Sequence, residues 1–304
     1  MNPVSEIRGI ILMLLSILFF TINTLAVRAL ALSFPECDGW IVTLFRGIAG
    51  TLVVVILYSK SGQLRMASVW KRPKVVVRGL LGAIGVSFFY ITIIELGAAR
   101  AVVINLTYPI FAALLAAVFL KESLSVKKLF WIITGFLGLV IFLAPKAIHS
   151  GIGPYDLLAV AGAITAAAVV VLIRDLHKSE HGSTIFASQA VYCAILAFPL
   201  TLTKETSWDL PTSGFLFLIL AGFVVAAGQL TMTFAYRHLE VSKGASLQLL
   251  LPIATGTGAW IFFDETFGLI ELLGAALTLI ATMMINRRPS KSSVKKLKTQ
   301  PTNS

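Results

Sequence analysis

The chain has 304 residues, of which 57% are hydrophobic and 13% are charged, and its mean hydropathy is +0.90. A water-soluble domain of this length needs far more charge to cover its surface, so the composition excludes an ordinary soluble globular protein. The formal net charge of +11 would suit a nucleic-acid partner, but the positions of the charges give a different explanation.

Long apolar blocks follow one another along the chain. A block of about 20 apolar residues spans the hydrocarbon core as a helix, whereas a β-barrel would show short alternating segments. The sequence predicts ten transmembrane helices, at residues 9–29, 39–58, 76–95, 101–119, 128–145, 155–173, 184–203, 213–234, 243–263 and 268–286. The first block is too long for a cleavable signal peptide. The predicted fold class is therefore all-α integral membrane.

The basic residues gather on one side of this predicted membrane. With the N-terminus in the cytoplasm, 20 of the 25 Lys and Arg residues fall inside, including those of a 60–78 loop, and Arg46 lies within a span. The four on the outside are Arg28, Arg100, Lys146 and Lys204. This bias follows the positive-inside rule and predicts a protein of the cytoplasmic (inner) membrane with both termini cytoplasmic. The basic loops then contact anionic lipid of the bilayer, and we expect no nucleic-acid partner.

The chain repeats itself with an offset of 143 residues. A P-I-x8-F-x2-E pattern occurs twice at this offset, as Pro109, Ile110, Phe119 and Glu122 and as Pro252, Ile253, Phe262 and Glu265. Each half holds five predicted spans, so the second half enters the membrane from the opposite side. Inverted repeats of this kind are typical of transporters with a binding site between the halves. The predicted repeats cover residues 9–145 and 155–286, followed by a disordered, basic cytoplasmic tail at 287–304.

Two five-helix units that each carry this pattern and a Gly/Ala-rich last helix resemble the EamA-domain branch of the drug/metabolite transporter superfamily. The resemblance covers about residues 9–286 and implies ten helices, inverted halves, a central cavity and the movement of small metabolites. The first helix, with Phe20, Asn23 and Arg28, departs from the Trp-Gly pattern common in that family. The segment from Pro35 to Arg46 is similar to members that move organic anions or cofactor-like solutes.

Two prolines, Pro109 and Pro252, lie inside predicted spans at equivalent positions of the two halves. Each removes one helix hydrogen bond and frees the carbonyl four residues earlier, at Asn105 and at Gln248. Both of those residues also carry amide side chains, which must face protein or a water-filled cavity inside a membrane. We therefore predict two helix hinges and two substrate-binding amides, with a plain interhelical hydrogen bond as the alternative.

Arg46 lies about 12 Å below the outer surface by helix rise. An intramembrane charge is a functional candidate, and in a cavity it would favour a substrate with a carboxylate or a phosphate. A structural ion pair with Glu95 is the alternative interpretation. The counterpart of Arg46 in the second half is Gln189. Further polar or aromatic candidates for substrate binding are Asn23, Tyr90, Tyr108, Tyr192, Gln229 and Tyr236.

The pattern favours a secondary transporter that moves a small organic metabolite (amino-acid-like, cofactor-like or an organic anion) by alternating access. A membrane-embedded enzyme would need a metal-ligand cluster or a Ser/His pair, and a channel would need a filter or a ring of charges. Neither pattern occurs, so the sequence indicates no catalytic residue, cofactor or metal. Glu122 and Glu265 are expected to cap helices or make turn contacts, and Cys37 and Cys193 to serve in packing.

Overall fold

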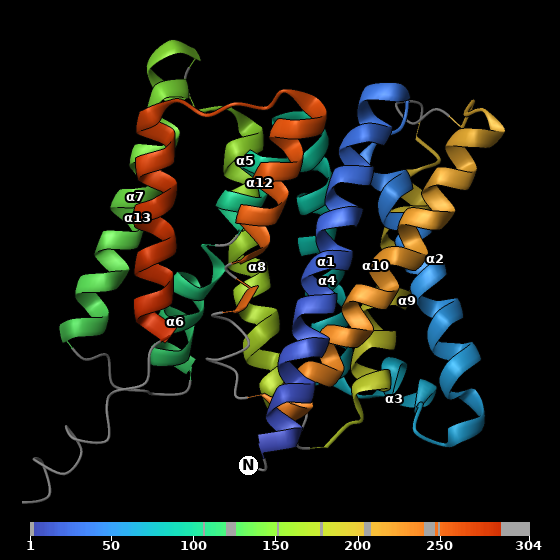
Figure 1. Ribbon diagram of the computed structural model, residues 1–304. Helices are drawn as coiled ribbons and strands as arrows, with labels where there is room; N and C mark the ends of the chain where they lie inside the picture. Colours follow the sequence, from blue (N-terminus) through green and yellow to red (C-terminus); the bar gives the residue numbers. More distant parts are fainter. Residues whose placement is uncertain are drawn as a thin grey trace, which may run out of the picture.

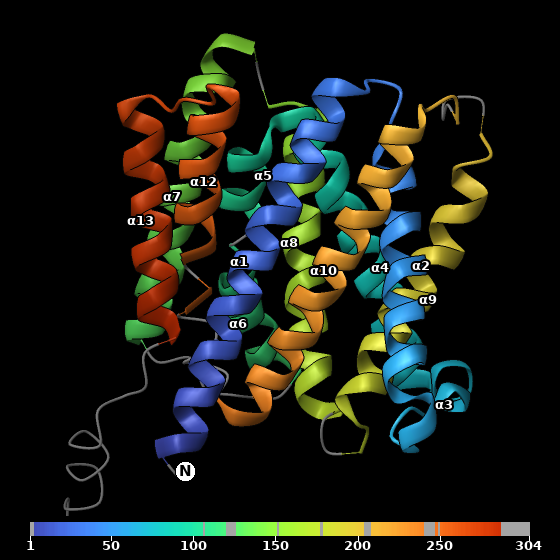
Figure 2. The same cartoon turned by 45° about the vertical axis from the view of Figure 1, so that its right-hand side comes forward.

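The computed structural model describes residues 3–105, 107–119, 126–150, 152–176, 179–203, 208–239, 247–248 and 250–286. Helices make up most of these residues, and no strand occurs among them. The long helices run along one common direction and form a single bundle (Figures 1 and 2). The fold is therefore all-helical, as the composition predicts.

The first half of the chain begins with a long helix and contains one short helix in a loop. Its helices are α1 (Pro3–Ser33), α2 (Gly39–Tyr58), η1 (Ser59–Ser61), α3 (Met66–Lys71), α4 (Pro73–Leu96), α5 (Ala98–Asn105), α6 (Tyr108–Phe119) and α7 (Val126–Ser150). The second half contains α8 (Pro154–Leu176), α9 (Gly182–Leu200), α10 (Thr212–His238), α12 (Leu250–Phe263) and α13 (Leu269–Asn286).

Six helical stretches in the described residues are long and apolar enough to cross a membrane. They are Ile7–Ser33, Gly39–Ser61, Pro73–Leu96, Pro154–Ile173, Gly182–Leu200 and Thr212–Ala235, and each coincides with a predicted span. The other four predicted spans correspond to shorter apolar helices at Ala98–Ala112, Leu129–Phe142, Leu250–Phe263 and Leu269–Met284. Glu122 and the predicted tail at 287–304 lie outside the described residues.

The predicted span at 101–119 is divided in the structure, because α5 ends at Asn105 and α6 begins at Tyr108. The Thr107 N–H and hydroxyl both donate to the Ile104 carbonyl, at 3.1 and 2.7 Å, and close a tight turn between the helices. Pro109 thus lies in the first turn of α6, where its missing N–H costs no intrahelical hydrogen bond. Pro252 lies in α12, and residues 247–248 before it are helical as well. In the first half the predicted single helix is therefore two helices with the proline just after the break, and the hinge roles of Pro109 and Pro252 stay predictions.

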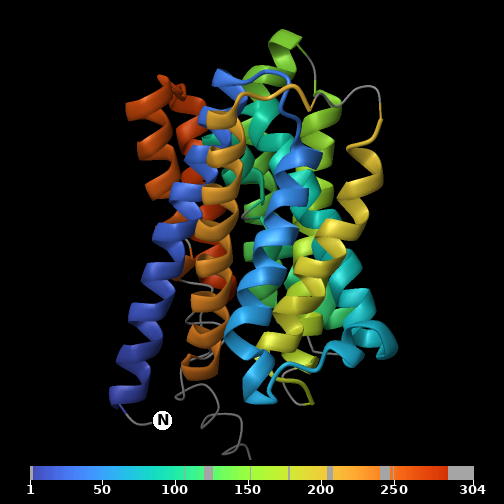
Figure 3. The same ribbon diagram turned by 90° about the vertical axis from the view of Figure 1, so that its right-hand side faces the viewer.

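The two halves pack against each other through several pairs of helices. The closest helix pairs are α7 with α13, α1 with α10, α2 with α9 and α4 with α8, and each pair joins one half to the other. Figure 3 shows α1 and α10 side by side. Chain order therefore does not decide which helices are neighbours.

Small residues bring helices of opposite halves close together, as they do in membrane proteins generally. A methyl group added to Gly79 of α4 would lie 2.9 Å from the Ser188 carbonyl oxygen of α9. A methyl group added to Gly222 of α10 would lie 3.0 Å from the Phe45 carbonyl oxygen of α2. The two contacts are related by the 143-residue offset, since 79 corresponds to 222 and 45 to 188.

Both cysteines are buried in hydrophobic clusters, as expected for packing residues. Cys37 lies in the turn between α1 and α2. Burial, together with the negative charges of Asp38 and Glu36, raises the pKa of the Cys37 thiol to about 12. The thiol of Cys37 is therefore protonated at neutral pH, and a thiol reagent meets little thiolate there.

The two ends of the bundle differ in what they contain. The first turn of α1 and the last turn of α13 lie at the same end, at the bottom of Figure 1. We call this the N-terminal end; the connection between α8 and α9, at residues 179–181, also lies there. The opposite end contains the turn between α1 and α2 and the connection between α12 and α13.

Candidate functional site

A cavity of about 670 Å³ lies between helices of both halves. Its volume falls in the range that ligand pockets for small organic molecules usually have. Much of its wall is apolar or aromatic and includes Phe20, Val86, Phe89, Val170, Met232 and Phe234. The cavity extends to the N-terminal end of the bundle, where Glu180, His181 and Gly182 line it.

Seven of the ten residues that the sequence offers for substrate binding line this cavity: Asn23, Arg46, Asn105, Tyr108, Gln189, Gln229 and Gln248. Of the other three, Tyr90 is fully buried and contacts Arg46, and the side chain of Tyr236 lies outside the part of the chain that the structure describes. Tyr192 does not line the cavity and donates instead to the Val69 carbonyl of α3, at 3.3 Å. The structure therefore brings together residues from both halves that lie far apart in the sequence.

Arg46, on α2, is held by neutral side chains from three other helices. Its Nη1 donates to the Tyr90 hydroxyl at 3.0 Å, and its Nη2 donates to Gln229 Oε1 at 3.2 Å. The Tyr90 hydroxyl donates in turn to Asn23 Oδ1 at 2.9 Å, and Asn23 Nδ2 donates to the Ala221 carbonyl at 3.1 Å. The guanidinium also lies over the Tyr90 ring, 5.6 Å from its centroid. The position of the Arg46 charge is therefore fixed by α1, α2, α4 and α10.

The ion pair between Arg46 and Glu95, which the sequence left open, is not formed. Glu95 is exposed near the end of α4, whereas Arg46 donates to the hydroxyl of Tyr90 and the amide of Gln229. Tyr90 lies more than one helical turn before Glu95, so Arg46 points deeper into the bundle than the ion pair would require.

A second polar contact joins the two halves at the predicted amide positions. The Tyr108 hydroxyl of α6 donates to Gln248 Oε1 at 2.8 Å. Gln248 Nε2 contacts the Met232 sulfur at 3.0 Å. Asn105, at the end of α5, lines the same cavity. The two predicted amides therefore lie on one cavity, and one of them is bonded across the interface.

Arg78 was missed by the sequence analysis, which counted it with the basic loop at 60–78. Because α4 begins at Pro73, Arg78 lies inside the helix, where it is 1% exposed and lines the cavity. Its Nε and Nη1 have no hydrogen-bond partner among the described residues. One signal was present in the sequence: both Arg46 and Arg78 are followed directly by glycine.

The acidic residue of the cavity has a basic partner of its own. Glu180 Oε1 lies 2.6 Å from Arg72 Nη1, and the Glu180 side chain is fully buried. Its neighbour His181 begins α9: its Nδ1 accepts from the Ser183 N–H at 3.3 Å. We therefore interpret Glu180 and His181 as residues that hold the start of α9 in place.

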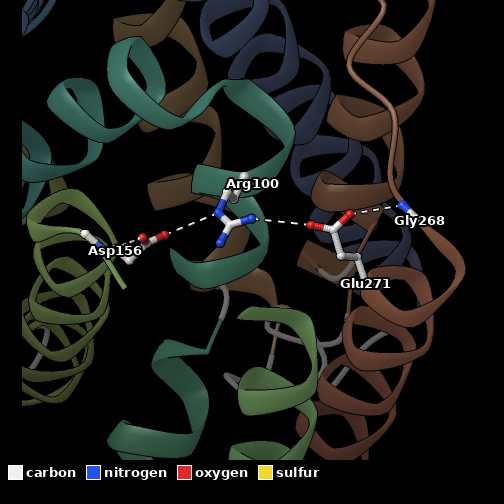
Figure 4. A network of polar contacts seen from close by, with 5 residues as sticks. Arg100, Asp156, Gly268 and Glu271 are labelled. Carbon is white, nitrogen blue, oxygen red and sulfur yellow. Dashed lines mark hydrogen bonds and ion pairs between the residues drawn. The ribbon is translucent and has the colours of Figure 1, made fainter. Parts of the chain in front are cut away.

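Ion pairs join the two halves at the opposite end of the bundle. Arg100, at the start of α5, lies between Asp156 of α8, at 3.2 Å, and Glu271 of α13, at 3.4 Å. Both carboxylates also accept backbone N–H groups, those of Gly153 and Gly268, as Figure 4 shows for Glu271. The side chains of Arg100 and Asp156 are 11% and 1% exposed.

A second ion pair lies at the same end. Arg28 Nε lies 2.7 Å from Glu265 Oε1. Glu265 also accepts the N–H groups of Ala98 and Ala99, at 3.3 and 3.2 Å, and so caps the start of α5. The capping role expected for Glu265 is confirmed, although the helix that it caps belongs to the other half.

Comparison with known proteins shows the family of the chain. The EamA-like transporter family matches it twice, at residues 7–144 and 153–287. The chain belongs to this family. A solved crystal structure of another protein, 18% identical, has the same fold, with a TM-score of 0.64 over 100% of both chains.

Several relatives in this family of transporters span most of the chain. The pseudopaline exporter CntI of Pseudomonas aeruginosa is 23% identical over 287 residues, which cover 92% of this chain and 96% of the exporter. A riboflavin transporter of Rhizobium johnstonii is 30% identical over 218 residues, covering 70% of this chain and 69% of the relative. The S-adenosylmethionine uptake transporter of Rickettsia prowazekii is 25% identical over 304 residues, 97% of each chain. The chain is therefore a membrane protein whose relatives move small molecules.

Proposed function

We propose that the chain is a secondary transporter that moves a small organic metabolite across the cytoplasmic membrane by alternating access. The observation that carries this proposal is the asymmetry of the bundle. The cavity extends to the N-terminal end, whereas ion pairs of Arg28 and Arg100 join the halves at the opposite end. Such an arrangement corresponds to one of the two states that alternating access requires.

The relation between the halves supports a rocking motion. The repeat-related contacts of Gly79 and Gly222 make α4 lie on α9 in the way that α10 lies on α2. Two halves with equivalent contacts can exchange their arrangements, which would close the N-terminal end and open the opposite one. The hinges that we propose at Pro109 and Pro252 lie where each half would bend.

The distribution of basic residues supports an assignment of the side of the membrane that the open end of the cavity faces. Because the basic loops favour a cytoplasmic N-terminal end, the cavity as described would be open toward the cytoplasm. The opposite end, with Arg28 and Arg100, would then face outward. A channel is less well supported, because the ion pairs of Arg28 and Arg100 join the halves at one end and would have to break before a continuous pathway could form.

Uptake into proteoliposomes tests the proposal. We would begin with radiolabelled riboflavin and S-adenosylmethionine, which the names of relatives suggest. A transporter gives uptake that saturates with concentration and is competed by excess unlabelled solute, and Arg46→Ala should abolish it while Arg46→Lys retains some. Lys74→Gln, at an exposed ion pair with Asp175, is a control that should leave uptake unchanged. Flux that never saturates would identify a channel, and a chemically altered solute would identify an enzyme.

A further inference from the structure

Arg78 is a buried cation without a protein counter-charge among the residues described. It is 1% exposed, and neither Nε nor Nη1 has a hydrogen-bond partner there. A charged group in such a place costs several kcal/mol unless it is paired or hydrogen-bonded. Because Arg78 lines the cavity, the partner that it lacks can come from the contents of the cavity.

Arg46 lines the same cavity, and within the described part of the chain it has no carboxylate partner either. Its hydrogen bonds go to the Tyr90 hydroxyl and to the Gln229 amide, both of them neutral. These two bonds use two of the five N–H donors that a guanidinium carries. The protein therefore orients the Arg46 guanidinium without neutralising it.

The backbones that carry the two arginines lie at the same level of the bundle, and along α4 the Arg46 side chain reaches Tyr90 whereas the Arg78 side chain lies beside Gly82. Gly47, next to Arg46, packs against the Ala190 and Ala194 backbone of α9, and Gly79, next to Arg78, packs against Ser188 and Tyr192 of the same helix. Gln189, which lies between these contacts, faces the cavity. A methyl group at Gly82 would lie 3.2 Å from both Arg78 Nη1 and Gln189 Cγ, so Arg78 lies beside this amide.

The acid that lines the cavity does not compensate these charges. Glu180 lies 2.6 Å from Arg72, which supplies a cation of its own. In the second half, the positions that correspond to Arg46 and Arg78 at the 143-residue offset hold Gln189 and Ala221, which are neutral. Two positive charges therefore face the cavity from the first half alone.

We propose that Arg46 and Arg78 together bind a substrate that carries two negative charges, either two carboxylates or one phosphate monoester, on an apolar or aromatic body. Guanidinium groups recognise carboxylates and phosphates through paired hydrogen bonds. The apolar walls, with Phe20, Phe89 and Phe234, suit the remainder of such a molecule. This inference rests on the proposed transport function and narrows its substrate class to organic dianions.

A series of benzene derivatives tests the inference on the purified full-length protein. Isophthalate carries two carboxylates, phenyl phosphate one phosphate, benzoate one carboxylate and benzamide no charge. We expect isophthalate or phenyl phosphate to bind at least about tenfold more tightly than benzoate, because one more charge-assisted contact is formed. Benzamide should bind most weakly, and the two dianions distinguish a dicarboxylate site from a phosphate site. Equal affinity across the series, or binding of none of the four, would overturn the proposal.

Two variants make the result specific for the arginines. Arg46→Gln and Arg78→Gln should each reduce the preference for the dianion over benzoate by about tenfold, whereas Lys74→Gln should leave the preference unchanged. The variant Arg78→Met tests the effect of the Arg78 charge on the melting temperature in the absence of ligand. If the charge is uncompensated in the ligand-free protein, its removal should leave the melting temperature unchanged or higher. A lower melting temperature together with an intact preference for dianions would make Arg78 a structural residue and refute the proposal.

The outcomes also separate this inference from the proposed function. Saturable uptake of a neutral solute, with no competition by isophthalate or phenyl phosphate, would support the proposed transport function and refute the dianion site. Arginine-dependent binding of a dianion, without movement of any solute across the membrane, would support the dianion site and refute the proposed transport function.

Discussion

The contact between Gly79 and α9 makes a quantitative prediction about packing. In the variant Gly79→Ala the new methyl group would lie 2.9 Å from the Ser188 carbonyl oxygen and still closer to the Tyr192 ring. The carbonyl belongs to a buried helix and cannot turn away as the end of a flexible side chain can. Overpacking of this kind costs about 1–3 kcal/mol, and about 1 kcal/mol is regained because alanine favours helix over glycine.

The expected net loss is therefore up to about 2 kcal/mol, or a fall of up to roughly 8 °C in melting temperature. Thermal unfolding of the purified protein in detergent measures it. Gly222→Ala should behave in the same way, because its methyl group would lie 3.0 Å from the Phe45 carbonyl oxygen. Gly256→Ala is the matched control: it lies in α12 with no neighbouring atom within 4 Å, so its melting temperature should stay the same or rise.

A specific result would refute this reasoning. If Gly79→Ala and Gly256→Ala melt at the same temperature, α4 and α9 do not approach as closely as the structure describes. Because Gly79 directly follows Arg78, a real loss of packing should also weaken the binding of a dianion. A destabilised variant that binds normally would separate the packing of α4 from the position of Arg78.

Three further predictions concern the cavity and the topology. Tyr108→Phe removes the hydrogen bond to Gln248 and should weaken substrate binding several-fold, by about 1 kcal/mol, in a titration with the transported solute; unchanged affinity would exclude a binding role for this contact. Pro109→Ala and Pro252→Ala should leave the amount of protein in the membrane unchanged but slow transport, and normal rates in both would remove the proposed hinges. A membrane-impermeant thiol reagent should label Ile152→Cys in intact cells and Lys60→Cys after permeabilisation, whereas the reverse pattern would invert the orientation.

Much of the fold could be predicted because hydropathy is a local property of the sequence. Each long apolar block, such as the one at 39–58, corresponds to a helix in the structure. The break between α5 and α6 was harder to predict. Pro109 marks the position, but whether a helix bends or divides depends on the turn that Thr107 makes with Ile104. That turn is a result of packing and leaves no pattern in hydropathy.

The sequence predicted many of the residues that line the cavity, but not the contacts that these residues make with each other. Asn105, Gln189 and Gln248 were visible as polar residues in apolar segments, and all three line the cavity. The partners of Arg46 were not visible, because they depend on which helices of the two halves are neighbours. Arg78 was missed for a physical reason: an arginine near the end of a span ordinarily extends to the headgroups, and its sequence position does not distinguish that conformation from burial.

Access to the cavity from the two sides of the membrane tests alternating access most directly. Val170 lines the cavity, so Val170→Cys, with Cys37 and Cys193 replaced, can report the rate at which an impermeant thiol reagent reaches it from each side. The control variant Lys74→Gln removes an exposed cation at the N-terminal end.

We expect fast labelling of this cysteine from the cytoplasmic side and slow labelling from outside. Arg100→Gln leaves Asp156 buried without its cation, at a cost of about 3 kcal/mol, and should accelerate labelling from outside by up to about 100-fold. Lys74→Gln should leave that rate unchanged. An outside rate that is the same in Arg100→Gln and in the protein with Arg100 intact would contradict a pathway that opens at both ends in turn.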